Sequence, residues 1–200
     1  MSDANTEGPG AVKRLRATLL LSAEEKRHGD RFILGLYVLI NGAIAIGSLA
    51  ALAAITHQAF VFPSLGPTAF ILFFSAMSVQ AAPRNVFLGH LVGVLAGALA
   101  LAIFGLTTAP PDLDLVTWPR AGALTLAMCL TGALLIWLGI AHAPATATTL
   151  IVAFGLLHTA SQLLVLMLGV VLLLVQALVI NRLAGVPHPL WKPVGSSPPG

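Results

Sequence analysis

The sequence predicts an all-α integral membrane protein with two repeats of a span, a short broken helix and a second span. Three observations support this prediction: charges are rare, long tracts carry none, and prolines interrupt two of the apolar segments. Of the 200 residues, 58% are hydrophobic and 8% are charged, and the mean hydropathy is +0.95. About a quarter of the residues of a soluble domain are charged. The composition therefore excludes a soluble domain and makes a nucleic-acid partner remote.

The charged residues divide the chain into three parts. Eleven of the 17 lie within residues 1–31, and the other six are Arg84, Asp112, Asp114, Arg120, Arg182 and Lys192. The charge-free tracts 32–83, 85–111 and 121–181 each exceed the ~20 residues that cross a bilayer as a helix. We therefore expect a cytoplasmic basic segment at 1–31, a transmembrane domain at 32–182 and a Pro-rich tail at 183–200.

Four regular spans and two short helices are expected in the transmembrane domain. The regular spans are predicted at about 32–56, 86–106, 121–141 and 162–181. The short helices follow Pro67 and Pro144, at about 67–80 and 144–158. At 1.5 Å per residue, ~14 residues reach ~21 Å, which is less than the ~30 Å hydrocarbon core.

The basic residues predict the orientation in the membrane. With the N-terminus in the cytoplasm and six crossings, Arg84, Arg182 and Lys192 lie inside, and only Arg120 lies on the opposite side. Both termini are then cytoplasmic, in a bacterial inner membrane, and the two repeats are inverted relative to each other, as in many secondary transporters. If the short helices are re-entrant instead, four spans remain and the repeats are parallel.

The broken helices indicate a binding site for an anion. A helix that starts inside the membrane exposes unpaired N–H groups and the positive end of its dipole, and both favour an anion. No Asp or Glu lies in the apolar tracts, so a cation site is not expected. The candidate ligands are Ser64, Gly66 and Thr68 at the first break, His142, Ala143, Thr146 and Thr148 at the second, and His90 on the third span.

Several residue patterns resemble the HPP family of integral membrane proteins. They are Leu65-Gly66-Pro67-Thr68-Ala69, Pro83-Arg84-Asn85 with Gly89-His90, His142-Ala143-Pro144 with Ala145-Thr146-Ala147-Thr148, and Asn181-Arg182. The resemblance covers roughly residues 31–188 and implies a multi-span protein with a transport role, and nitrite as the anion. The His-Pro-Pro motif of the family reads His-Ala-Pro here, and the nucleotide-sensing domains of some members are not expected in the short tail.

Other roles remain open for these residues. Arg84 either attracts anions to the cytoplasmic mouth or only fixes the topology. Gly89, Gly93 and Gly97 have the spacing of a helix-packing face, within the chain or in a homo-oligomer. No enzyme motif, cofactor or metal site is predicted. The main alternative function is a membrane scaffold or assembly protein that transports nothing, and a histidine-bound metal is a remote one.

Overall fold

The computed structural model describes residues 31–111, 113 and 115–193. All of the predicted basic N-terminal segment except Arg31, and the end of the Pro-rich tail, lie outside these residues. The described part is all-helical and contains no strand. Its helices are α3 (Arg31–Thr56), α4 (Leu65–Phe74), the 3-10 helix η1 (Val79–Ala81), α5 (Pro83–Ile103), α6 (Trp118–Trp137), α7 (Ala145–Ala153) and α8 (Ala160–Leu183).

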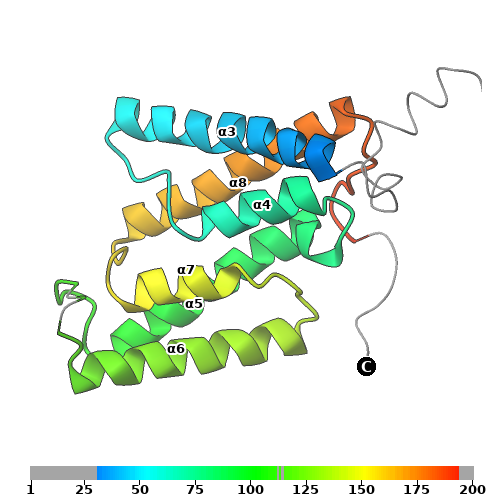
Figure 1. The fold of residues 1–200 in the computed structure, drawn as a ribbon. Helices are drawn as coiled ribbons and strands as arrows, with labels where there is room; N and C mark the ends of the chain where they lie inside the picture. Colours follow the sequence, from blue (N-terminus) through cyan, green and yellow to red (C-terminus); the bar gives the residue numbers. More distant parts are fainter. Residues whose placement is uncertain (1–30, 112, 114, 194–200) are drawn as a thin grey trace, which may run out of the picture.

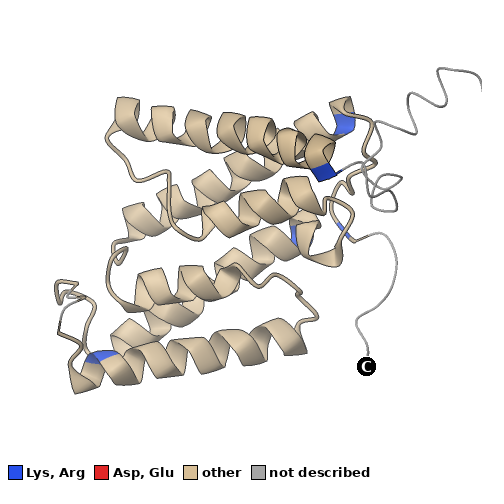
Figure 2. Cartoon of the chain, in the orientation of Figure 1, with Lys and Arg blue, Asp and Glu red and all other residues tan. Residues whose placement is uncertain are grey.

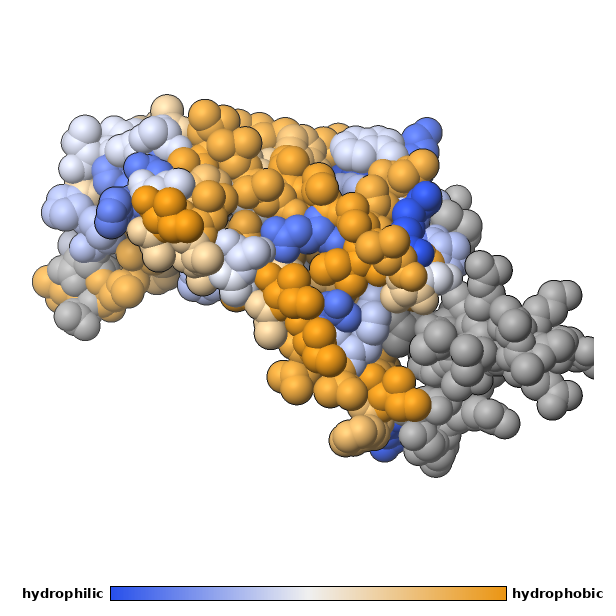
Figure 3. Space-filling model, turned by 90° about the horizontal axis from the view of Figure 1, so that it is seen from above, coloured by the Kyte–Doolittle hydropathy of each residue, from blue (hydrophilic) through white to orange (hydrophobic). Residues whose placement is uncertain are grey.

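Four of these helices, α3, α5, α6 and α8, are long and apolar enough to cross a membrane. The shortest of them, α6, has 20 residues, which corresponds to ~30 Å. Exposed apolar side chains cover much of the outside of the helices (Figure 3). The four predicted regular spans correspond to these four helices, with ends that shift by a few residues. For example, α6 begins at Trp118 because the Thr117 hydroxyl accepts a hydrogen bond from the Arg120 N–H.

The short helices differ from the prediction in both length and start. Helix α4 begins at Leu65, so Pro67 is its third residue, where the missing N–H costs nothing because the first-turn donors have no helical partner. It ends before Ser75, whose φ of −137° and ψ of 55° leave the helical region. Helix α7 ends at Ala153, before Gly155, which has a positive φ of 79°.

The two short helices begin in the same way, but the residues that correspond to each other are not the two prolines that were predicted to correspond. The residue before α4 is Ser64 (φ −70°, ψ −20°), and the residue before α7 is Pro144 (φ −58°, ψ −18°). The structure thus pairs Pro144 with Ser64, whereas the sequence pattern paired it with Pro67. With this alignment, Thr68 and Thr148 are both the fourth residue of their helix. Two threonines therefore occupy equivalent places in the two halves.

The helices pack in two groups, and each group contains two consecutive helices of one half of the chain and the last helix of the other half. Helices α3 and α4 pack with α8, whereas α6 and α7 pack with α5 (Figure 1). Helices α4 and α7 begin near the middle of the bundle and run towards opposite ends, and the chain before each of them is extended (Figure 1). Each extended segment and its short helix together traverse the bundle, so α3 and α5 start at the same end. From this path of the chain, we infer that the two halves are inverted relative to each other.

The basic residues of the described part gather at one end of the bundle. They lie at the start of α3, the start of α5, the end of α8 and in the C-terminal segment, and only Arg120 lies at the opposite end (Figure 2). By the positive-inside rule, the end with most basic residues is predicted to face the cytoplasm. We call it the basic end below.

Arg120 has a structural role that explains its position at the other end. Its side chain is 5% exposed, and its guanidinium donates hydrogen bonds to the carbonyls of Ala153, Ala109 and Pro110 at 3.3, 3.5 and 3.1 Å. Ala153 is the last residue of α7, where a helix has free carbonyls and the negative end of its dipole. Arg120 therefore terminates α7 and holds the loop before α6.

We predict that Arg120→Met lowers the free energy of unfolding in detergent by about 2–4 kcal/mol. The substitution leaves the buried Ala153 carbonyl without this donor, which costs about 1–3 kcal/mol, and also removes two part-buried hydrogen bonds to the loop carbonyls of Ala109 and Pro110. Arg84→Met is the control, because Arg84 is half-buried and bonds a single carbonyl outside its own helix at 3.5 Å. Thermal unfolding of the two variants gives the comparison. Equal stability of the two proteins would contradict the role assigned to Arg120.

The segment after α8 folds back onto the basic end. Nδ2 of Asn181 donates to the Leu72 carbonyl at 2.9 Å and lies 2.8 Å from Nδ1 of His188, while the Tyr37 hydroxyl donates to its Oδ1 at 2.7 Å. Nε2 of His188 lies 3.2 Å from the carbonyl of Ala81. A carbonyl only accepts, so Nε2 carries the proton and Nδ1 accepts from Asn181. The bonds of His188 therefore require a neutral ring.

We predict that the C-terminal segment loosens as the pH falls below about 6.5. Burial lowers the pKa of His188 from its ordinary value of 6.5, and the nearby Arg182 lowers it further, against the opposing effect of the Ala81 carbonyl. The unfolded segment therefore binds more protons below pH 6.5, so its docking is most stable above that pH and weakens below it. Fluorescence of Trp191, in a variant without Trp118 and Trp137, measures the docking. His188→Gln is expected to remove the pH dependence, and an unchanged pH profile would contradict this explanation.

Candidate functional site

Five polar side chains meet inside the bundle where the two short helices begin. Ser64 and Thr68 belong to the start of α4, and Thr148 belongs to α7. His90 lies on α5, and His142 lies in the extended segment before α7. None of the five is more than 2% exposed. Each was predicted as a site residue from the sequence, and the fold brings them together from segments up to 84 positions apart.

The five side chains form one hydrogen-bonded network. Nε2 of His90 lies 3.0 Å from Oγ1 of Thr68 and 3.3 Å from Nε2 of His142, and Nδ1 of His90 lies 2.7 Å from Oγ1 of Thr148. The Thr148 hydroxyl donates to Oγ of Ser64 at 2.9 Å, and the Thr68 hydroxyl donates to the Ser64 carbonyl at 2.9 Å. The network thus connects α4, α5 and α7 across the centre of the bundle. We call these five residues the central cluster.

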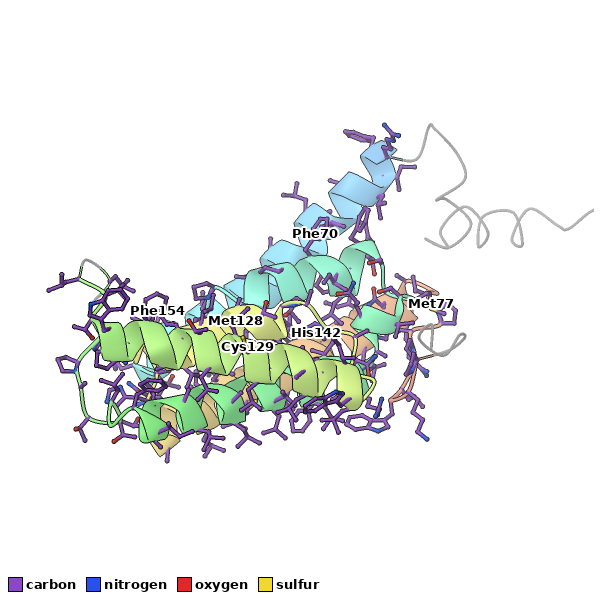
Figure 4. All side chains as sticks on the ribbon, turned by 90° about the horizontal axis from the view of Figure 1, so that it is seen from below. Phe70, Met77, Met128, Cys129, His142 and Phe154 are labelled. Atoms are coloured by element: carbon purple, nitrogen blue, oxygen red, sulfur yellow. The ribbon has the colours of Figure 1, made fainter. Side chains whose placement is uncertain are left out.

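Gln80 connects the central cluster to the basic end. Nδ1 of His142 lies 2.9 Å from the Gln80 carbonyl, and the side-chain oxygen of Gln80 accepts a hydrogen bond from the Ala143 N–H at 3.2 Å. Gln80 is exposed. Its partner His142, labelled in Figure 4, is buried among the helices. Gln80 was not predicted as a site residue, because a single glutamine at the end of a predicted helix gives no sign of its partner 62 positions away.

Two glycines of α5 allow α7 to come close enough to build the cluster. A Cβ on Gly93 would lie 2.6 Å from the Ala145 carbonyl oxygen, and one on Gly97 would lie 2.7 Å from the Cβ of Val152. Gly89 faces the Cβ of His142 in the same row. The predicted packing face is therefore used within the chain, against α7. A homo-oligomer through these glycines stays a prediction, and α7 covers this face in the chain described here.

Three of the predicted binding residues do not join the central cluster. Gly66 is exposed and lines a hollow of about 340 Å³ with Ile46, Val61, Phe62 and Pro63. Ala143 is exposed, and the Thr146 hydroxyl donates to its carbonyl at 2.8 Å. The hydroxyl of Thr146 is thus occupied outside the network, and Thr148 is the threonine of α7 that reaches it.

Most N–H groups at the start of α7 already have partners. Those of Ala145, Thr146 and Ala147 donate to the carbonyls three residues earlier, at 3.2, 3.1 and 3.1 Å, and that of Ala143 donates to Gln80. The expected anion ligands, backbone N–H groups after Ala143, are therefore not free in this conformation. The reason is the tight first turn of α7, which sequence patterns do not reveal. Side-chain hydroxyls and imidazoles are therefore more available as anion ligands than the backbone N–H groups of this turn.

Two more contacts complete the surroundings of the cluster. The hydroxyls of Thr131 on α6 and Thr149 on α7 lie 2.8 Å apart, which ties these helices together beside the cluster. Arg84 lies at the start of α5, at the same end of the bundle as Gln80, where its N–H donates to the Trp191 carbonyl at 3.0 Å. Its position fits a mouth residue, although its guanidinium contacts the Leu138 carbonyl and Asn85 rather than the cluster.

The central cluster consists of hydroxyls and imidazoles and contains no permanent charge. The described residues include no Asp or Glu, as Figure 2 also shows. Within the same residues, no group of three or more His, Cys, Asp or Glu is placed to hold a metal ion. The cluster can donate several hydrogen bonds to a small ligand, and its histidines can also take up a proton.

These features define a class: an α-helical integral membrane protein with two interrupted helices that meet at a buried polar cluster. The family model for the transmembrane region of HPP proteins matches residues 30–189. The chain therefore belongs to the HPP family, as its motifs predicted. Comparisons with curated proteins and with solved structures found no match.

Proposed function

We propose that this protein transports a small monovalent anion, with nitrite as the first candidate, across a bacterial cytoplasmic membrane. The observation that carries the proposal is the central cluster. Ser64, Thr68 and Thr148 come from two helices that start inside the bundle, and they meet His90 and His142 in a described region that contains no Asp or Glu. Interrupted helices that meet near the midplane are a common way to build the substrate site of a transporter.

The chemistry of the cluster favours a singly charged anion. Its donors are hydroxyls and imidazole N–H groups, which are neutral and few. Removing a divalent anion from water costs much more than removing a monovalent one, and among the described residues no lysine or arginine bonds the cluster to offset that cost. Nitrite fits these donors and is the anion that the family resemblance implies. Nitrate, formate and chloride are competing candidates with the same charge.

Access to the cluster in this proposal runs through Gln80. The exposed Gln80 covers His142 and uses its two oxygens to occupy the His142 Nδ1–H and the Ala143 N–H. An anion that enters from the basic end has to displace these oxygens. Movement of the two helix groups against each other would then expose the cluster to the opposite side, as in alternating access.

Flux measurements on the purified protein in liposomes test the proposal. We expect saturable nitrite uptake well above that of protein-free liposomes, with competition by nitrate, formate or chloride according to selectivity. Flux equal to that of empty liposomes, from protein shown to be folded by its thermal unfolding transition, would refute transport of these anions.

One observation favours the alternative, a non-transporting scaffold or assembly protein. The polar atoms of the central cluster are hydrogen-bonded to each other or to Gln80, so the cluster can stabilise the bundle without any ligand. In that case, deletion of the protein should change the abundance of a partner complex, and the liposomes should show no flux.

A further inference from the structure

The two histidines of the central cluster form a close pair with a defined pattern of protons. Their Nε2 atoms lie 3.3 Å apart, and both side chains are at most 2% exposed. The Gln80 carbonyl can only accept, so Nδ1 of His142 carries a proton and its Nε2 is an acceptor when the ring is neutral. With its proton on Nε2, His90 can donate to Oγ1 of Thr68 at 3.0 Å or to Nε2 of His142 at 3.3 Å. The two ring protons of the neutral pair then serve three of the four ring nitrogens, and Nδ1 of His90 is the fourth.

The fourth ring nitrogen is able to take up an additional proton. Nδ1 of His90 lies 2.7 Å from the Thr148 hydroxyl, which lies 2.9 Å from Oγ of Ser64. A hydroxyl both donates and accepts. In the structure the Thr148 hydroxyl donates to Ser64, an arrangement in which it can accept from a protonated Nδ1 of His90. When Nδ1 carries no proton, the same hydroxyl can turn and donate to it instead. Rotation of one hydroxyl group therefore accommodates the proton without moving the helices.

A proton on this pair requires a negative charge beside it. The groups that face the pair are the hydroxyls of Thr68, Thr148 and Ser64 and the carbonyl of Gln80, and all of them are neutral. Arg84 and Arg120 bond carbonyls elsewhere, and no acid is present in the described residues. An isolated buried cation costs far more than a paired one. The negative charge therefore has to come from a bound anion.

We propose that the His90–His142 pair takes up one proton with each anion, so that the protein moves a proton and a monovalent anion in the same direction. This inference rests on the proposed function. The proton comes from water on the entry side, bonds to Nδ1 of His90 and returns to water on the exit side when the anion leaves. The transported unit is electrically neutral, so a membrane potential does not drive it and a pH gradient does.

Liposomes that contain the purified protein and an internal pH dye test this coupling. An inward gradient of nitrite, or of nitrate as an anion of a strong acid, is imposed while potassium and valinomycin hold the potential at chosen values. Protein-free liposomes give the passive entry of nitrous acid, which is subtracted. We expect protein-dependent acidification equal to the anion uptake, at a rate that the potential does not change.

Each outcome of this experiment has a distinct meaning. Anion uptake that follows the potential and brings no acidification would overturn the coupling and leave anion transport intact. Absence of uptake for nitrite, nitrate, formate and chloride, with folded protein, would overturn both. These arms use the natural sequence, so they do not depend on the folding of any variant.

Variants assign the coupling to the histidine pair. His90→Gln and His142→Gln should lose the protein-dependent acidification, because glutamine forms hydrogen bonds and takes up no proton. His158→Gln is the matched control, since His158 lies after α7, bonds the Gly155 carbonyl and has no contact with the cluster. If both pair variants still move protons and anions in equal amounts, the proton site lies elsewhere.

Discussion

Replacing Thr148 with valine is expected to reduce nitrite flux by about ten- to a hundredfold, whereas Thr146→Val is expected to leave it nearly unchanged. The Thr148 hydroxyl contacts both His90 and Ser64 in the central cluster. The Thr146 hydroxyl donates to the Ala143 carbonyl and stays outside the cluster. A hydrogen bond to a charged group contributes about 1.5–3 kcal/mol, and each 1.4 kcal/mol corresponds to a factor of ten in affinity.

The two variants make the same substitution on the same helix, and their sites differ because Thr148 is buried in the cluster whereas Thr146 is half-buried outside it. Both replace a threonine by its isosteric apolar counterpart, and both lie in the first four residues of α7. Initial rates over a range of nitrite concentrations separate weaker binding from slower turnover. Equal flux of the two variants would show that the cluster is not the substrate site, and the sequence-based choice of Thr146 would then regain interest.

The double variant Gly93→Ala with Gly97→Ala is expected to lower the free energy of unfolding by about 2–6 kcal/mol. The two new Cβ atoms would meet the Ala145 carbonyl oxygen at 2.6 Å and the Cβ of Val152 at 2.7 Å. Overpacking of this kind costs about 1–3 kcal/mol at each site. The shift of α7 that relieves the contacts should also displace Thr148 from His90, so anion flux should fall with stability.

Gly35→Ala with Gly132→Ala provides the control for the glycine variants. A Cβ at either of these helical positions meets nothing within 4 Å. Alanine has the higher helix propensity by about 1 kcal/mol, so this control should be as stable as the parent or more stable. Thermal unfolding in detergent measures the stability of both double variants. A stable Gly93 and Gly97 variant with normal flux would contradict the close packing of α5 on α7.

Much of the candidate site could be predicted from the sequence because each break carries its own local signal. Prolines next to hydroxyl residues in an apolar tract are rare unless the helix is interrupted, so Ser64, Thr68, His142 and Thr148 stood out. His90 lies within a regular predicted span, where no break in the helix marks it. The other predicted ligands, Gly66, Ala143 and Thr146, have the same local signal but lie on the outer side of the breaks.

The sequence by itself determined that the chain spans a membrane, where its regular helices lie and that two helices are interrupted. These properties follow from hydropathy, charge and proline, which act over neighbouring residues. Only the tertiary structure decided that Thr68 and Thr148 are equivalent, that Gln80 covers His142 and that Arg120 terminates α7. Each of these depends on contacts between distant segments, and such contacts form because buried polar groups must find partners wherever the packed helices place them.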